Sequence, residues 1–270
     1  MVSFPNCKIN LGLNVLRKRN DGYHDLETVF YPLPFCDILE IITAKGPTDL
    51  INTGIQTGSP HENLCIKAYE LLKKEFPALP NIHIFLHKLI PAGAGLGGGS
   101  SDAAFMLRLL NQKFRLTIPD DKLCDYALTL GSDCPFFILN RPAFAASRGE
   151  KLENYDISLS GYKIVIVHPG ISLSTASMFN EVDPAEPAVS IKETLTLPVQ
   201  DWKYQLINDF EKPVFRRYPE IKKIKELLYE GGALYAALSG SGSAVYGIFD
   251  TSVNIKIVFP GHYLVKEIML

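Results

Sequence analysis

Several features that would assign this chain of 270 residues to other classes of protein are missing. No apolar run approaches the length of about 20 residues that a helix needs to cross a bilayer, so we expect no membrane span. The chain does not begin with a basic stretch followed by an apolar core, so we expect no signal peptide. Its formal net charge is −2, which excludes the basic footprint of a nucleic-acid-binding protein. We find no internal repeat and no low-complexity segment.

Cysteine and histidine are also used in ways that exclude particular sites. The five cysteines are odd in number and form no C-x-x-C pair, which argues against a disulfide framework and against a zinc site. This usage fits a reducing cytoplasm, where we expect the protein to work. The six histidines are scattered, and none lies three or four residues from another with a carboxylate nearby. We therefore expect no metal site built by the protein alone.

The remaining composition is that of an ordinary globular protein. Hydrophobic residues make up 47% and charged residues 21% of the chain, which is enough to bury a core. The length fits one large or two modest domains. The composition changes after Phe144, and a polar, turn-rich stretch follows at residues 148–159. We therefore predict an N-terminal domain at residues 1–155 and a C-terminal domain at residues 156–270.

Hydrophobic periodicity predicts the elements of both domains. Strict alternation from Lys8 to Val15 predicts a half-buried strand, in which Lys8 and Asn10 point to one face about 7 Å apart. Other strands are predicted at residues 37–42, 81–87, 162–167, 233–238, 244–249, 254–259 and 263–268, and helices around residues 64–72, 103–110, 119–130, 200–217 and 219–230. The second domain thus has a strand, then helices, then a cluster of strands, which suggests an α+β domain.

The most informative segment is rich in glycine: residues 91–104 read PAGAGLGGGSSDAA. Glycine lets the backbone take positive φ and leaves no Cβ between the N–H groups and a ligand. The segment connects a predicted strand to a predicted helix, so its N–H groups and the helix N-terminus can face one anion. Flexible linkers are polar and do not join a strand to an amphipathic helix. We therefore predict a phosphate-binding loop.

Two common kinds of phosphate loop fit this segment poorly. A P-loop needs a lysine after its second glycine, and Gly99 stands at that position. The dinucleotide fingerprint G-x-G-x-x-G is matched from Gly93 to Gly98, but it should be followed about 20 residues later by an acidic residue after a second strand. Asp120 and Asp121 lie near that distance but follow Pro119 at the start of a predicted helix. An NAD-binding oxidoreductase is therefore disfavoured but stays open.

The segment resembles the second motif of the GHMP kinases, the family named after galactokinase, homoserine kinase, mevalonate kinase and phosphomevalonate kinase. K-I-N-L-G-L at residues 8–13, with D-G-Y-H-D-L at residues 21–26, and L-S-G-S-G-S-A-V-Y at residues 238–246 resemble further family motifs. With G-S-D-C-P-F-F at residues 131–137, they are similar to the subfamily that phosphorylates a cytidine-diphosphate-linked methylerythritol. The resemblance runs from about Lys8 to about Phe249, nearly the whole chain.

The resemblance implies the fold and the reaction. The expected fold is α+β, the two-domain GHMP kinase fold with an N-terminal α/β nucleotide-binding half, a C-terminal ferredoxin-like half and the active site in the cleft between them. The expected reaction is ATP-dependent phosphorylation of the 2-hydroxyl of the cytidylylated methylerythritol, in the non-mevalonate route to isoprenoid and terpenoid precursors. ATP is the implied donor and Mg²⁺ is expected, although no acidic residue resembles the metal-binding Glu of the mevalonate kinase branch.

Two residues are predicted to carry the chemistry. A kinase places the acceptor hydroxyl in line with the γ-phosphate and stabilises the charge on the transferring group. One carboxylate that orients or deprotonates the hydroxyl, and one cation, suffice for this. Asp133 follows a predicted helix, and Pro135 disfavours helical geometry at Cys134, which would hold Asp133 in a fixed turn. The resemblance identifies Asp133 as the catalytic base and Lys8 as the cation that acts with it.

The resemblance also assigns residues to the two ligands. The acceptor is expected to contact Asn10, Tyr23, His24 and Thr175; Tyr23 offers an aromatic face to a pyrimidine, and His24 offers a donor and an acceptor to its edge. The residues expected to bind ATP are Pro91, Ala92, Gly93, Ala94, Gly95, Leu96, Gly97, Gly98, Gly99, Ser100 and Ser101, with Lys88 and Asn63 near the adenine.

Two other functions remain open within the same fold. A homoserine or mevalonate kinase is disfavoured by the D-G-Y-H sequence at residues 21–24. A non-catalytic nucleotide-binding sensor is disfavoured by the presence of both Lys8 and Asp133, because a sensor needs no base. We expect a small-molecule substrate with a cytidine diphosphate group, no nucleic-acid or membrane partner, and a monomer or weak homodimer.

Overall fold

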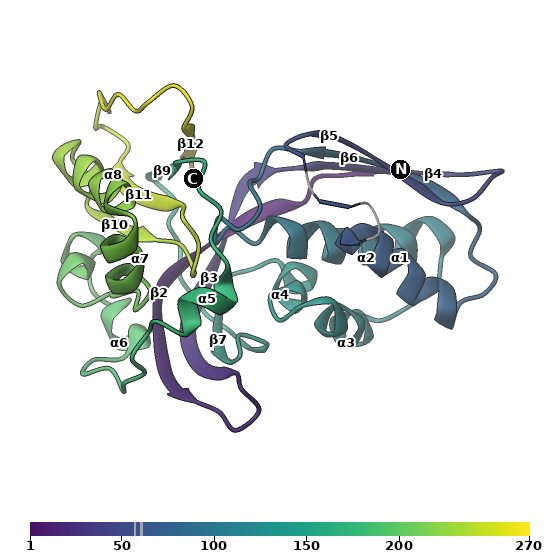
Figure 1. Ribbon diagram of the computed structural model, residues 1–270, viewed down its shortest axis with the longest axis horizontal. Coiled ribbons are helices and arrows are strands. Elements are labelled where there is room, and N and C mark those ends of the chain that lie inside the picture. Colours follow the sequence, from purple (N-terminus) through teal and green to yellow (C-terminus); the bar gives the residue numbers. More distant parts are fainter. Residues whose placement is uncertain (57, 60–61) are drawn as a thin grey trace. The chain divides into compact units, whose positions relative to one another are not determined.

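The computed structural model describes residues 1–56, 58–59 and 62–270 (Figure 1). The chain folds as two compact units that are not continuous in sequence. Unit 1 comprises Met1–Cys7, Pro34–Ala92 and Gly97–Arg141, and unit 2 comprises Lys8–Leu33, Gly93–Leu96 and Pro142–Leu270. The predicted boundary between residues 155 and 156 divides the chain differently and stays a prediction.

Unit 1 is built on a four-stranded sheet with helices on one side (Figure 1). Its strands, in spatial order, are β1 (Val2–Ser3), β4 (Ile38–Thr43), β6 (Ile82–Lys88) and β5 (Asp49–Gly54). Strand β4 is antiparallel to β1 and β6, and β5 is parallel to β6. The helices are α1 (Leu64–Glu75), α2 (Gly98–Phe114), α3 (Asp120–Leu130) and α4 (Cys134–Leu139). The connection from β6 to α2 is the glycine-rich segment.

Unit 2 contains most of a sheet formed by two long strands and a short hairpin. Its order is β2 (Asn6–Lys18), β3 (His24–Cys36), β7 (Ala143–Ser147) and β8 (Lys151–Asn154). Strand β3 pairs antiparallel with β7, with Leu26 opposite Ser147. The turns of the β2–β3 and β7–β8 hairpins are therefore near neighbours at one end of this sheet.

The second sheet of unit 2 is antiparallel throughout, with the order β10 (Tyr235–Leu238), β11 (Val245–Asp250), β9 (Tyr162–His168) and β12 (Leu264–Met269). In chain order these strands are β9, β10, β11 and β12. The first of them, β9, lies between the third, β11, and the fourth, β12, as in ferredoxin-like sheets. The helices are α5 (Thr175–Phe179), α6 (Ile191–Thr194), the 3₁₀ helix η2 (Val199–Tyr204), α7 (Glu211–Arg217) and α8 (Pro219–Glu230). Ile221, Ile224 and Leu228 of α8 join the buried core of this sheet. The predicted α+β class is confirmed.

Several predicted elements differ from the structure. The helix predicted at residues 200–217 is interrupted, because Leu13 of β2 exchanges backbone hydrogen bonds with residues 207 and 209. Residues 254–259 form no strand; alternate side chains there pack on the core of unit 2 without pairing in a sheet. Strands β1, β3, β5, β7 and β8 were not predicted. Within the described residues, no helix combines the length and apolar character that crossing a membrane requires.

Candidate active site

Strand β2 presents Lys8 and Asn10 on one face, as its alternation predicts, but residues 8–15 are buried on both faces and the strand is not half-buried. Both are buried, with 3% and 2% of their surface exposed, and the Lys8 ammonium donates to Asn10 Oδ1 at 2.5 Å. The Asn10 amide donates to the Thr28 hydroxyl at 2.9 Å, which in turn donates to the Gly12 carbonyl at 2.6 Å. The ammonium also lies 4.9 Å from the centre of the Phe30 ring. This chain of contacts fixes the Lys8 ammonium in one position.

The glycine-rich loop has the backbone geometry that a phosphate cradle requires. Gly93, Gly95 and Gly97 take φ values of +67°, +77° and +72°, whereas Ala94 and Leu96 between them are not left-handed. Alternating handedness turns successive N–H groups toward one concave side, which can hold an anion. Helix α2 begins at Gly98 directly after this loop, and its N-terminus adds partial positive charge.

The first half of the loop, residues 93–96, packs inside unit 2 against the motif at residues 238–246. The Gly95 carbonyl accepts hydrogen bonds from the Lys8 ammonium at 3.0 Å and from the Ser239 hydroxyl at 2.9 Å. A Cβ at Gly95 would collide with the Ser239 carbonyl, and a Cβ at Gly242 would collide with the backbone of Ala94 and Gly95. The motif at residues 238–246 therefore supports the loop, a role that sequence reasoning did not assign to it.

The second half of the loop starts α2 inside unit 1. Gly99 is exposed, whereas Gly98 and Ser101 are buried. The Ser101 hydroxyl is buried without a hydrogen-bond partner in the described structure, and so is Asp102 Oδ1. A hydrogen bond joins Ser100 to Cys134, but burial dominates and raises the pKa of the Cys134 thiol to about 12. Cys134 is therefore a packing residue rather than a nucleophile.

Lys88, predicted to lie near the adenine, ends β6 with its ammonium enclosed by two carboxylates of unit 1. It donates to Asp102 at 2.7 Å and also pairs with Asp37, and its side chain is 2% exposed. Asp37 additionally accepts the backbone N–H groups of Leu89 and Ile90 at 2.6 and 2.9 Å. The three side chains thus tie the end of β6 to the start of α2, on both sides of the glycine-rich loop. Asp37 and Asp102 were not singled out from the sequence.

Asp133 lies half-buried in the turn between α3 and α4. The Cys134 N–H donates to the Gly131 carbonyl at 3.1 Å and closes this turn. The expectation that Pro135 would keep Cys134 out of a helix is wrong, because α4 begins at Cys134. Proline is tolerated in a first helical turn, where its missing N–H would have no partner in any case. Asp133 belongs to unit 1 and Lys8 to unit 2.

Tyr23 and His24 stand at the β2–β3 turn of unit 2. Tyr23 is 55% exposed and His24 only 8%. The His24 ring stacks on Phe179 of α5, with ring centres 4.9 Å apart and planes at 15°. Burial, and then the nearby Lys18, lower the pKa of His24, so the ring is neutral at pH 7 and offers one donor and one acceptor.

The last two predicted residues stand at the starts of helices. Thr175 is exposed at the start of α5 and accepts a hydrogen bond from the Ser241 hydroxyl at 3.0 Å, which joins it to the motif at residues 238–246 within unit 2. Asn63 is the N-cap of α1, where its side chain accepts the Cys65 N–H at 2.9 Å. No described residues form a group of three or more His, Cys, Asp or Glu able to hold a metal ion.

Comparison with family models and curated proteins gives a consistent result. The model described as GHMP kinases N terminal domain matches residues 63–141, and the model described as GHMP kinases C terminal matches residues 200–259. A protein of Bacteroides fragilis (strain YCH46) named 4-diphosphocytidyl-2-C-methyl-D-erythritol kinase is 52% identical over 259 residues, which cover 94% of each chain. A protein of the same name from Parabacteroides distasonis is 52% identical, over 95% of this chain and 94% of its own length.

Solved structures agree with these matches. The crystal structure of a 4-(cytidine 5'-diphospho)-2C-methyl-D-erythritol kinase superposes with a TM-score of 0.79 at 33% identity, covering 92% of this chain and 90% of that one. Methanococcus jannaschii mevalonate kinase superposes with a TM-score of 0.71 over 100% of this chain and 98% of its own, but at 14% identity it shares only the fold. The predicted family is confirmed: the chain belongs to the GHMP kinases, in the family of the 4-diphosphocytidyl-2-C-methyl-D-erythritol kinases.

Proposed function

We propose that the chain transfers the γ-phosphoryl group of ATP to the 2-hydroxyl of 4-diphosphocytidyl-2-C-methyl-D-erythritol, a step toward isoprenoid precursors by the non-mevalonate route. The observation that carries this proposal is the 52% identity, over 94% of the chain, to a kinase named for this substrate. We further propose that it acts in the cytoplasm, where ATP is supplied, as a monomer or weak homodimer.

The glycine-rich loop is proposed to hold the phosphates of ATP. Its alternating backbone and the N-terminus of α2 supply N–H donors, and the exposed Gly99 leaves room for a phosphate to approach. Pro91, Ala92 and Ser100 flank these donors. Asn63 is proposed to contact the adenine side. The ammonium of Lys88 is enclosed by carboxylates, so Lys88 is proposed to contribute to ATP binding indirectly, by holding the two ends of the loop together.

Mg²⁺ is proposed to enter with ATP. Ser100 and Ser101 carry hydroxyl oxygens at the start of α2, and the Ser101 hydroxyl is buried without a hydrogen-bond partner in the described structure, which fits an ion that binds one or two protein oxygens together with phosphate and water. Bound there, Mg²⁺ would neutralise charge on the phosphates of ATP.

The chemistry is assigned to two groups. Asp133 is proposed to orient the acceptor hydroxyl and to take its proton, and Lys8 to stabilise the negative charge that develops during transfer. The hydrogen bonds from the Lys8 ammonium to Asn10 and Gly95 support this assignment, because a cation that is already positioned does not need to reorganise during the reaction.

The acceptor is proposed to be recognised by Asn10, Tyr23, His24 and Thr175. A neutral His24 can both donate to and accept from the edge of cytosine, and Tyr23 can stack on its face. Loss of a stacked ring costs about 1–3 kcal/mol per base. Tyr23→Ala and His24→Ala should therefore raise the KM for the acceptor and leave the KM for ATP nearly unchanged. An equal rise in both constants would mean that these residues support the fold instead.

The experiment that tests the proposed function is ADP release against a panel of acceptors. The cytidylylated methylerythritol should be phosphorylated, whereas mevalonate and homoserine should not be. Turnover with mevalonate or homoserine alone would favour a GHMP kinase of another type. ATP binding without turnover of any acceptor would favour a nucleotide-binding sensor.

A further inference from the structure

The turns of two neighbouring hairpins in unit 2 meet at Tyr23. Tyr23 lies in the β2–β3 turn, and Arg148 lies in the β7–β8 turn. The centre of the Arg148 guanidinium is 5.0 Å from the centre of the Tyr23 ring, a distance typical of a cation–π contact. The ring is thus covered on one side by protein, while the residue as a whole stays 55% exposed.

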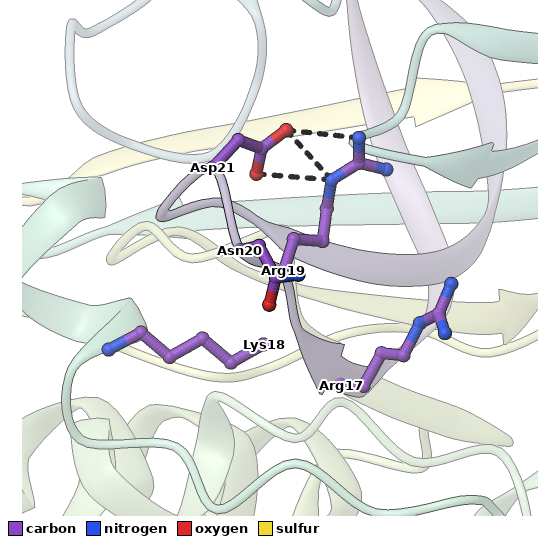
Figure 2. Close-up of a pocket in the computed structure, with 5 residues that line it drawn as sticks. All are labelled: Arg17, Lys18, Arg19, Asn20 and Asp21. Carbon is purple, nitrogen blue, oxygen red and sulfur yellow. Dashed lines mark hydrogen bonds and ion pairs between the residues drawn. The ribbon is translucent and has the colours of Figure 1, made fainter.

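The backbone of Tyr23 is held as well as its ring. Its N–H donates to the Asp21 carboxylate at 3.1 Å, and its carbonyl accepts the Arg19 N–H at 2.8 Å. The Arg19 guanidinium donates to both Asp21 oxygens, at 3.2 and 3.0 Å, and to Asp25 at 2.8 Å. Figure 2 shows the Arg19 side chain turned toward Asp21, while Lys18 and Arg17 extend in other directions.

The same guanidinium connects the two hairpins. Arg19 also donates to the Ser147 hydroxyl at 3.2 Å, at the end of β7. Ser147 takes a φ of +64°, a left-handed conformation that is uncommon for a residue with a Cβ. The hydrogen bond from Arg19 therefore fixes the strained turn that carries Arg148. Glu150 holds Arg148 from the other side, by accepting its backbone N–H at 2.8 Å.

We propose that Arg148 is a positioning residue for the acceptor: it lies against the Tyr23 ring and keeps that ring ready to stack on the cytidine group. This inference rests on the proposed role of Tyr23 in acceptor binding. Immobilising a free side chain on binding costs about 0.5–1.5 kcal/mol. A Tyr23 ring that is already held avoids this cost when the acceptor binds, so the acceptor binds more tightly. Arg148 acts through Tyr23 and needs no contact with the substrate.

The test is a double-mutant cycle on the KM for the acceptor. Arg148→Met keeps an unbranched apolar stem and removes the planar cation, and it should raise the acceptor KM by about two- to tenfold. The kcat and the KM for ATP should stay within about twofold, since the donor site is untouched. In a Tyr23→Ala background, Arg148→Met should add nothing, because the ring that it positions is gone.

Arg17→Met is the matched control. Arg17 stands on the same hairpin and pairs with Asp25 at 2.5 Å, with 76% of its side chain exposed, so its loss should leave the acceptor KM within about twofold. Arg148→Gln is a second variant in case Arg148→Met does not fold, as judged by circular dichroism, and the same rise is expected for it.

Each other outcome overturns the inference. If Tyr23→Ala raises the acceptor KM but Arg148→Met does not, Arg148 positions nothing, and the proposed function is unaffected. If Arg148→Met raises the KM equally with and without the Tyr23 ring, Arg148 binds the substrate directly, for instance through its diphosphate. If Tyr23→Ala itself has no effect, both the inference and the assignment of Tyr23 fail.

Discussion

Replacing Lys88 by methionine tests whether the buried contacts around the glycine-rich loop hold unit 1 together. The substitution keeps the length of the side chain and removes the ammonium that pairs with Asp37 and Asp102. These carboxylates are 0% and 5% exposed, so water cannot replace the lost cation. Breaking a buried ion pair from one side costs about 3–5 kcal/mol, a large share of the 5–15 kcal/mol that stabilises a typical domain.

The loss of stability should depend on pH in a defined direction. Burial raises the pKa of Asp102 to about 7, against the attraction of Lys88, whereas an unfolded aspartic acid has a pKa of about 3.9. Between these values the unfolded chain releases a proton that the folded chain keeps, so the contribution of Asp102 to stability falls as the pH rises. Without Lys88 the pKa rises further, and the fall continues above pH 7. The variant should therefore lose more stability at about pH 8 than at about pH 5.5.

Urea denaturation followed by circular dichroism measures both effects. Lys67→Met is the matched control, because Lys67 is exposed on α1 of the same unit, and its loss should change stability by at most about 0.5 kcal/mol. In the Lys88→Met background, Asp102→Asn removes one uncompensated carboxylate and should restore part of the stability at pH 8. A loss below about 1 kcal/mol, or an equal loss at the two pH values, would refute this reasoning.

Three further predictions concern the proposed reaction. Gly99→Ala adds a Cβ whose nearest neighbour is Leu64, at 3.8 Å, so the fold should be retained while calorimetry shows weaker ATP binding; unchanged affinity would mean that no phosphate lies there. Asp133→Asn should lower kcat by about 10²–10⁴, Lys8→Met should also lower it, and the double variant should be little worse than either; additive losses would argue against joint action. Gly242→Ala should destabilise unit 2 by about 1–3 kcal/mol, because its Cβ would overlap the backbone of Ala94 and Gly95. Denaturation followed by the fluorescence of the single tryptophan measures this loss, and an unchanged denaturation midpoint would contradict it.

Local patterns predicted the parts of the fold that depend on nearby residues. The alternation around Lys8 and Asn10 gave strand β2 and their shared face, and the glycine spacing gave the backbone of the loop. The resemblance gave the family. Residues 254–259 were predicted as a strand because alternation reports burial on one side, and Ile255, Ile257 and Phe259 are indeed partly buried against the core, but the segment does not pair in a sheet.

Contacts between residues far apart in the sequence could not be predicted from local patterns. Asp37 precedes Lys88 by 51 residues, and Arg148 follows Tyr23 by 125 positions in the sequence. An aspartate after a strand or an arginine in a turn has no local periodicity that reveals its partner. The support of Gly95 by Ser239 likewise joins residues 144 apart, although the glycine-rich motif at residues 238–246 marked that segment as unusual.

The most direct test of the central claim is phosphorus NMR of the purified protein with ATP and 4-diphosphocytidyl-2-C-methyl-D-erythritol. Transfer to a hydroxyl predicts that ATP is converted to ADP while one new phosphomonoester resonance appears and the diphosphate resonances of the acceptor remain. The Asp133→Asn variant should give this product far more slowly. ADP formed without a new phosphomonoester, or a cleaved diphosphate, would contradict the proposed reaction.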